Sequence, residues 1–145
     1  HNVLEPACGG GHMAEVLKAK GYNVTSSDIQ DYGYGMILDF FNIDYFHGDV
    51  VTNPPYVLAD KFIQHSLDII PDGNKVAMLL RLNFLESRKR QELFQKHPPK
   101  TVYVAIERMR IAKNGNFEDY KVGAIAYAWF VWEKGYKGVT ELRWC

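Results

Sequence analysis

The chain opens with 1-HNVLEPACGGGHMAEVLKAKG-21. Residues 1–5 have the apolar pattern of a strand, and residues 13–20 are strong helix formers that end at Gly21. Three successive glycines between them let the backbone approach a ligand closely, and the helix that follows presents free N–H groups at its positive end. This order of strand, glycine turn and helix predicts an α/β fold with a nucleotide-type ligand at the turn.

A second strand is predicted over residues 23–28, and it ends in an acid, Asp28. Asp28 lies 23 residues after Glu5, which is where a carboxylate reaches ribose hydroxyls in doubly wound folds. A turn residue or a helix cap is the alternative interpretation of Asp28. Together with the glycine turn upstream, the spacing favours the ribose role.

The glycine spacing indicates which nucleotide is expected. A dinucleotide site has the pattern G-x-G-x-x-G, whereas residues 9–14 read Gly-Gly-Gly-His-Met-Ala. Glu5 also places an acid at the end of the first strand, where it would repel a pyrophosphate but attract a cationic amino-acid group. A sulfonium cofactor with an α-amino group therefore fits better than NAD.

The remaining segments alternate between strand and helix patterns. Asp39 and Phe40, at the end of an irregular segment over 36–41, suit an acid that binds a cofactor adenine amine and an aromatic ring that stacks on it. Core packing of Phe40 and Phe41 is the alternative, and Asp44 competes for the polar role. Strands are predicted at 48–52, 75–82, 101–105 and 124–132, and helices at 57–70 and 84–96.

This order predicts one α/β domain over residues 1–145, with a mostly parallel sheet, helices on both faces and an antiparallel last strand. Since the chain begins directly in a strand, we expect that an N-terminal flanking segment is missing.

Val50-Val51-Thr52-Asn53-Pro54-Pro55-Tyr56 forms a second motif, in which a strand runs into a rigid corner. Proline fixes its own φ and restricts the preceding residue, so Asn53, Pro54 and Pro55 hold their polar atoms in place. An amide oxygen, a proline carbonyl and the face of Tyr56 suit a flat group that bears an NH2. The alternative is an ordinary proline turn with a surface tyrosine.

The composition limits the class of protein. Apolar residues make up 47% of the chain, which argues against disorder, and 17 basic residues balance 17 acidic ones. Any nucleic-acid contact must therefore come from a local patch, for which Arg108, Arg110 and Lys113 in the polar stretch 107–122 are the candidates. The alternative for these three is a plain surface loop, and the charged helix at 84–96 is more typical of a solvated face.

Cysteine usage and hydropathy set the expected surroundings of the protein. Cys8 and Cys145 form no metal-binding or redox motif, so no metal is expected. No window approaches the ~18 consecutive apolar residues of a membrane span. A reducing, intracellular compartment is the expectation.

These motifs together resemble an S-adenosylmethionine-dependent DNA adenine-N6 methyltransferase of the small kind found in phages and prophages. Residues 4–11 are similar to that family's cofactor motif, Asp28 falls at its ribose-binding acid, and Asp39-Phe40 at its adenine-binding segment. Residues 53–56 match the catalytic Asn-Pro-Pro-Tyr motif in full, and residues 127–135 resemble the family's last segment.

The resemblance implies a Rossmann-like class I methyltransferase fold with a seven-stranded type of sheet. It also implies S-adenosyl-L-methionine as the cofactor, double-stranded DNA as the partner and the cytoplasm of a bacterium or phage-infected host as the location. The implied catalytic residues are Asn53, Pro54, Pro55 and Tyr56, and the implied cofactor-binding residues are Glu5, Ala7, Gly9, Gly11, Asp28, Asp39 and Phe40.

The sequence departs from that family in two ways and leaves alternatives open. The family usually has a cofactor-contacting segment before the first strand and a target-recognition domain, and residues 1–145 show neither. The same four-residue motif serves enzymes that methylate adenine in RNA or a glutamine amide in a protein. A cofactor-binding scaffold without turnover and a homodimeric assembly also stay open.

Overall fold

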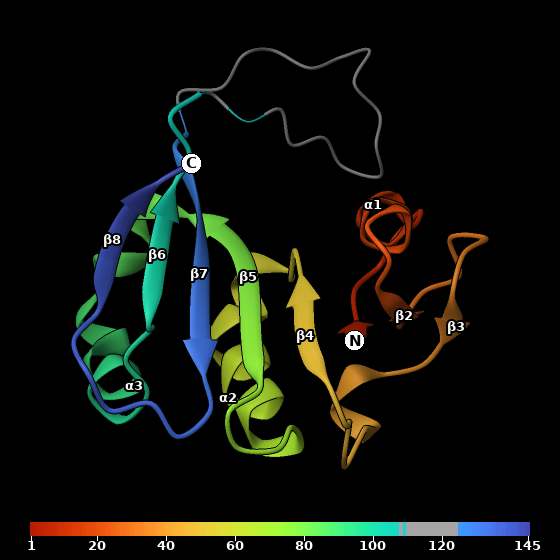
Figure 1. The fold of residues 1–145 in the computed structure, drawn as a ribbon, viewed down its shortest axis with the longest axis horizontal. Helices are drawn as coiled ribbons and strands as arrows, with labels where there is room; N and C mark the ends of the chain where they lie inside the picture. The colour runs from red at the N-terminus through yellow and green to blue at the C-terminus, as the bar shows by residue number, and fades with distance from the viewer. Residues whose placement is uncertain (108, 110–124) are drawn as a thin grey trace.

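The computed structural model describes residues 1–107, 109 and 125–145. Its central element is a sheet of eight strands (Figure 1). The strand order is β3-β2-β1-β4-β5-β7-β6-β8. The strands are β1 Asn2–Glu5, β2 Asn23–Asp28, β3 Met36–Ile37, β4 Asp49–Thr52, β5 Lys75–Arg81, β6 Thr101–Val104, β7 Tyr127–Glu133 and β8 Glu141–Trp144.

All neighbouring strands run parallel except where β7 lies between β5 and β6, to both of which it is antiparallel. Figure 1 shows the β7 arrow pointing opposite to its two neighbours. The predicted mostly parallel sheet with an antiparallel strand near the end of the chain is therefore confirmed, but that strand, β7, is not the last one, and the sheet has eight strands rather than seven. The chain adds a strand that the sequence did not predict, β8, which pairs parallel to β6 at the sheet edge.

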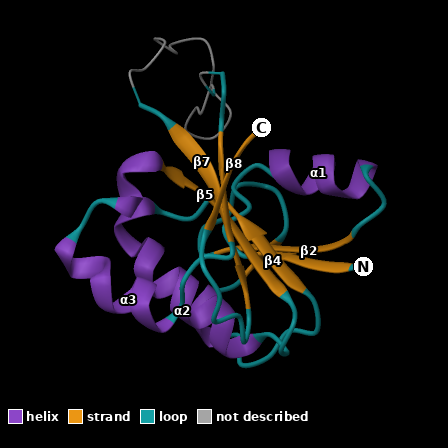
Figure 2. Cartoon of the chain, turned by 60° about the vertical axis from the view of Figure 1, so that its left-hand side comes forward, coloured by secondary structure: helices purple, strands orange, loops and turns teal. Residues whose placement is uncertain are grey.

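Three α-helices cover the two faces of the sheet within the described residues. They are α1 His12–Ala19, α2 Ala59–Ile69 and α3 Gln91–Lys96. Figure 2 shows α1 on one side of the sheet and both α2 and α3 on the other, as the sequence predicted. Short 3₁₀ turns join them: η1 Phe40–Asn42, η2 Tyr56–Leu58, η3 Leu82–Leu85 and η4 Arg88–Arg90.

The single helix predicted over 84–96 is wrong, because two 3₁₀ turns occupy its first half and only α3 is α-helical. Ser87 interrupts the helix: its backbone is extended, with φ −171°, and its hydroxyl accepts a hydrogen bond from the backbone N–H of Lys89. A serine side chain that bonds to nearby backbone offers the chain an alternative to continuous helix.

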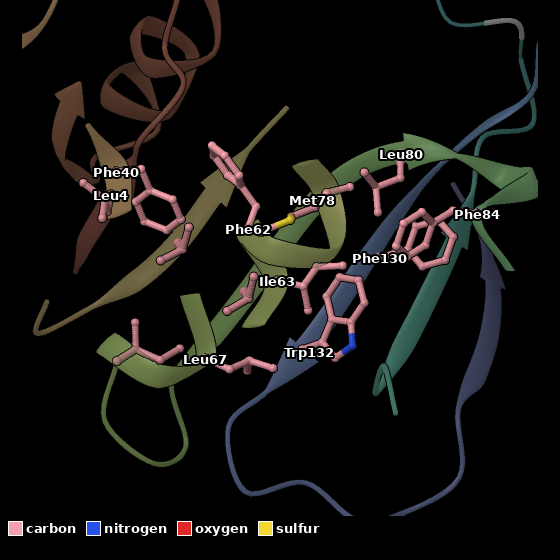
Figure 3. Close-up of a cluster of buried hydrophobic side chains, with 14 of the residues drawn as sticks. Leu4, Phe40, Phe62, Ile63, Leu67, Met78, Leu80, Phe84, Phe130 and Trp132 are labelled. Carbon is pink, nitrogen blue, oxygen red and sulfur yellow. The ribbon is translucent and has the colours of Figure 1, made fainter. Parts of the chain in front are cut away.

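The main core lies between α2 and the sheet (Figure 3). Phe62, Ile63 and Leu67 of α2 pack against β5 and β7, where Met78 and Phe130 are fully buried. Side chains 128, 130 and 132 of β7 point into this core, as the two-residue period of a strand requires. This packing holds β4 and β5 in fixed positions, and the carboxyl ends of these strands carry the candidate site.

Candidate active site

The carboxyl ends of β1, β2, β4 and β5 meet at one edge of the sheet because these strands are parallel. Since β1 lies between β2 and β4, Glu5 at its end stands between Asp28 and the segment that follows Thr52. In open α/β sheets, ligands bind at this edge. The structure therefore brings the glycine turn, the acids and the proline corner together.

The glycine turn after β1 is fixed by backbone hydrogen bonds. The Cys8 N–H donates to the Ser27 carbonyl at 3.0 Å, and the Gly9 N–H donates to the Asp28 Oδ2 at 2.9 Å. Gly11, at φ +81°, begins α1 in a conformation that L side chains rarely adopt. The turn is thus tied to the end of β2, and Asp28 orients it.

Tyr34 covers this turn, a role that sequence analysis missed. A Cβ added at Gly11 would lie 2.5 Å from the Tyr34 ring, so the ring packs directly on the glycine. The Tyr34 hydroxyl donates to Glu15 at 2.5 Å and accepts from Lys18 Nζ at 2.7 Å. The only signal in the sequence was a loop of alternating tyrosine and glycine at 32–35, which does not show what the rings contact.

Glu5 is a buried acid in this site. Its side chain is 2% exposed, and its Oε2 has no hydrogen-bond partner among the described residues. Burial raises the pKa of the Glu5 carboxyl to about 8, and the nearby Asp28 carboxylate adds to the shift. A buried acceptor without a partner is costly, so this oxygen is available to a donor from a ligand.

Asp39 and Phe40 separate in the structure. The Asp39 Oδ1 caps η1 by accepting from the Phe41 N–H at 3.0 Å, and its side chain is partly exposed. The Phe40 ring is 2% exposed and packs on Phe62 and His65, with ring centroids 4.8 Å apart in each pair. The core alternative therefore holds for the Phe40 side chain, and only its backbone can face a cofactor.

The proline corner leaves hydrogen-bond acceptors unused. Among the described residues, the Asn53 Oδ1 is buried without a hydrogen-bond partner, and no backbone N–H donates to the Pro54 carbonyl. The chain then turns into η2, where the Leu58 N–H donates to the Pro55 carbonyl at 2.9 Å. Proline at 54 and 55 supplies no N–H that could compete for these acceptors.

Tyr56 stands at the end of this corner, between Tyr127 and Arg81. Its ring centroid lies 6.2 Å from that of Tyr127 and 5.1 Å from the Arg81 guanidinium carbon. Burial, and then the neighbouring Tyr127 hydroxyl, raise the pKa of the Tyr56 hydroxyl well above its ordinary value.

A cavity of about 290 Å³ opens beside this tyrosine. It is lined by Tyr56, Ala59, Leu80, Arg81, Asn83, Phe84, Glu86, Ser87 and Arg90. A second cavity, of about 230 Å³, lies at the opposite end of β5 and β7, near His97 and Lys134. Among the predicted site residues that the structure describes, Tyr56 lines the first cavity and none lines the second, so the proline corner borders the first.

Arg108, Arg110 and Lys113 lie outside the described residues. Within the described ranges, no cluster of three or more His, Cys, Asp or Glu side chains is arranged to hold a metal ion. Those ranges also contain no helix with the length and apolar character needed to cross a bilayer.

Comparison with solved structures identifies the architecture. A protein from Listeria monocytogenes named as a candidate class I S-adenosylmethionine-dependent methyltransferase superposes with a TM-score of 0.67 at 15% identity. A candidate RNA methyltransferase from Pyrococcus horikoshii superposes with a TM-score of 0.68 at 14% identity. The chain has the class I methyltransferase fold. An S-adenosylmethionine-dependent O-methyltransferase from Thermotoga maritima also matches, with a TM-score of 0.59 at 14% identity.

Coverage defines how far these likenesses extend. The Listeria match covers 98% of this chain and 58% of that protein, and the Pyrococcus match covers 92% and 74%. The Thermotoga match covers 94% of this chain and 60% of that protein. No protein-family model matches the sequence, and no curated protein matches it. The likeness therefore establishes a Rossmann-like fold that S-adenosylmethionine-dependent enzymes share, and the substrate must be argued from the site.

Proposed function

We propose that this chain transfers a methyl group from S-adenosyl-L-methionine to the exocyclic N6 of adenine in DNA. The observation that carries the proposal is the pair of unused acceptors at the proline corner, the Asn53 Oδ1 and the Pro54 carbonyl. An amine with two hydrogens satisfies both. Tyr56 beside them offers a ring face for the base that bears the amine.

The site also suits the cofactor. A carboxyl with a free buried oxygen at Glu5 matches the cationic amino-acid end of S-adenosylmethionine, and Asp28 at the end of β2 matches its ribose hydroxyls. The backbone of Ala7, Gly9 and Gly11 would line the path between them. When bound, the cofactor supplies an electrophilic methyl group.

The adenine end of the cofactor has a separate proposed partner. The partly exposed Asp39 side chain can accept from the adenine amine, and the Phe40 backbone lies next to it. Since the Phe40 ring is in the core, we assign no stacking role to that side chain. Phe41 follows with 37% of its surface exposed and is the aromatic side chain available there.

The target nitrogen needs help because its lone pair is delocalised into the adenine ring. When Asn53 and Pro54 accept its two hydrogens, the nitrogen moves toward tetrahedral geometry and its lone pair becomes a better nucleophile. The base must leave a duplex stack to reach these acceptors, and Tyr56 would hold it by its face. Positioning and electrostatics then provide the rate acceleration.

DNA contact is proposed to come from a local patch, because the chain has no net charge. From the sequence, Arg108, Arg110 and Lys113 are the proposed phosphate ligands. Neutralising all three should flatten the salt dependence of DNA binding by up to about three units of slope. An unchanged slope would assign them to the ordinary surface.

The test of the function is a labelled methyl-transfer assay with duplex DNA, RNA and protein substrates side by side, with Asn53→Ala as the matched inactive control. Transfer to DNA that this variant loses supports the proposal. Preferred transfer to RNA adenine or to a glutamine amide would contradict the DNA assignment and reassign the substrate. Cofactor binding without transfer to any of the three would indicate a binding scaffold.

A further inference from the structure

Arg81 has a position that the catalytic motif does not explain. It is the last residue of β5, and its backbone is held in register opposite Tyr127 of β7. Its guanidinium carbon lies 5.1 Å from the centroid of the Tyr56 ring. A fixed backbone thus places a planar cation beside the aromatic residue of the proline corner.

The Tyr56 ring is the contact of the Arg81 guanidinium. The guanidinium is exposed, and it forms no hydrogen bond or ion pair with any described residue. Arg90, which lines the same cavity, is engaged: its Nε donates to Asp60 at 3.1 Å, its Nη1 to the Phe84 carbonyl at 3.3 Å, and its guanidinium carbon lies 4.1 Å from the Phe84 ring centroid. Arg90 therefore has a structural role, and Arg81 is free to bind something else.

We propose that Arg81 is the second wall of a slot for the target base, with Tyr56 as the first. This inference rests on the proposed function and deepens it. Flat groups stack at about 3.5 Å, so a base between the two walls needs about 7 Å, and the Arg81 guanidinium must withdraw from its 5.1 Å position. The adjoining cavity of about 290 Å³, which both residues line, gives it room.

The slot restricts the substrate class. A guanidinium plane and a phenol ring both bind the π face of an aromatic base, and arginine stacking contributes to sequence-tolerant recognition of single bases. A glutamine amide has no such face and would leave the slot unfilled. The pair thus favours a nucleobase over a protein amide.

A binding experiment separates this role from simple phosphate contact. One short oligonucleotide carries a single adenine flanked by abasic positions, and a matched one is abasic throughout. Affinities are measured for the wild type, for Arg81→Ala and for Arg81→Lys, which keeps the charge but loses the plane. Arg88→Ala, an exposed arginine that does not line the cavity, is the control.

Both Arg81 variants should bind the adenine oligonucleotide roughly tenfold more weakly than the wild type and the abasic one equally well, and Arg88→Ala should match the wild type for both. If the variants bound both oligonucleotides more weakly to the same extent, or if Arg81→Lys recovered the wild-type affinity, Arg81 would be a phosphate ligand and the proposal would be overturned. Wild-type affinity of Arg81→Ala for the adenine oligonucleotide would also overturn it. Because binding is measured without turnover, a wild type that binds adenine through Arg81 but transfers no methyl group would refute only the proposed function.

Discussion

The backbone N–H of Gly9 donates a 2.9 Å hydrogen bond to the Asp28 Oδ2. This bond joins the turn after β1 to the end of β2, so the same carboxylate that we assign to the cofactor ribose also orients the glycine turn. The Gln30 N–H binds its other oxygen at 3.1 Å. The proposed ribose role would therefore couple cofactor binding to the folding of this turn.

Substitutions at Asp28 should separate these two roles. Asp28→Asn keeps one acceptor, for the Gly9 N–H, but presents an NH2 group to the Gln30 N–H, so it should lose less stability than Asp28→Ala does. Asp28→Ala should lose that bond and weaken binding of S-adenosylmethionine by roughly 1–3 kcal/mol, the cost of leaving hydrogen-bond partners unpaired. Calorimetric titration measures the cofactor affinity, and thermal unfolding measures the stability of the fold. Asp31→Ala on the adjacent loop is the control. Unchanged cofactor affinity in Asp28→Ala would remove Asp28 from the binding site.

Gly11 should tolerate alanine much less than Gly21 does. Both have positive φ, +81° and +89°, but only Gly11 has the Tyr34 ring where a Cβ would be, since a Cβ at Gly21 meets nothing within 4 Å. We expect Gly21→Ala to cost about 1–2 kcal/mol of unfolding free energy. Gly11→Ala should cost about 1–3 kcal/mol more, because the added methyl overpacks the site.

Chemical denaturation of both variants, repeated with Tyr34→Ala in the background, isolates the ring contact. The excess cost at Gly11 should disappear when the ring is absent, while the cost at Gly21 stays the same. If Gly11→Ala and Gly21→Ala lose the same unfolding free energy with Tyr34 present, the Tyr34 ring is not the reason that residue 11 must be glycine.

Glu5 should make stability depend on pH. Its pKa rises from 4.5 to about 8 on folding, so the folded protein holds more protons than the unfolded chain between these values. Stability conferred by the neutral carboxyl is present below pH 4.5 and is lost as pH rises toward 8. At about 1.4 kcal/mol per pKa unit, the loss is on the order of a few kcal/mol.

Urea denaturation of wild type and Glu5→Gln at pH 5 and pH 8.5 measures this effect. The variant should gain stability relative to the wild type at the higher pH, whereas the exposed control Glu15→Gln should show no such gain. A difference between wild type and Glu5→Gln that is the same at both pH values would contradict a buried, neutral carboxyl.

Binding of the cationic cofactor end should ionise Glu5. Near pH 7 the carboxyl is protonated in the free protein, so binding of S-adenosylmethionine should release a proton and tighten as pH rises toward 8. Calorimetry in buffers of different ionisation enthalpy counts the protons, and Glu5→Gln should abolish the release. No release in the wild type would place the amino-acid end of the cofactor elsewhere.

At the proline corner, chemistry and binding should respond differently to substitution. Asn53 acts mainly as the target nitrogen changes geometry, so Asn53→Ala should lower kcat strongly and leave cofactor affinity within a few fold. Single-turnover methyl transfer and calorimetry separate the two effects. An unfolded Asn53→Ala would show that the corner is structural.

Tyr56 should work through its ring rather than its hydroxyl. Because the proposed contact with the base is made by the face of the ring, Tyr56→Phe should keep most activity. Tyr56→Ala should lose a contact of roughly 1–3 kcal/mol and recover partly on DNA in which the adenine is mispaired and flips more easily. Equal damage from both substitutions would assign the function to the hydroxyl.

Local patterns in the sequence predicted much of the fold. Two stretches carry a strong local pattern: residues 1–20, with their strand, glycine turn and helix, and the apolar run at 75–82. The sequence predicts them because each depends on neighbours within a few positions. The antiparallel strand near the end and the helices on both faces followed from the order of elements. The four-residue corner at 53–56 was found in the same way, because proline restricts its own backbone and that of the preceding residue.

Tertiary packing decided what these patterns leave open. The β8 strand has no strong local signal and exists through its pairing with β6. The Phe40 ring entered the core because Phe62 and His65 surround it, and Tyr34 came to lie on Gly11 through a loop that sequence shows only as a loop. Arg81 reached Tyr56 only because β5 and β4 are neighbours in the sheet. Contacts between residues distant in the chain depend on how whole elements pack, and no local pattern of residues encodes them.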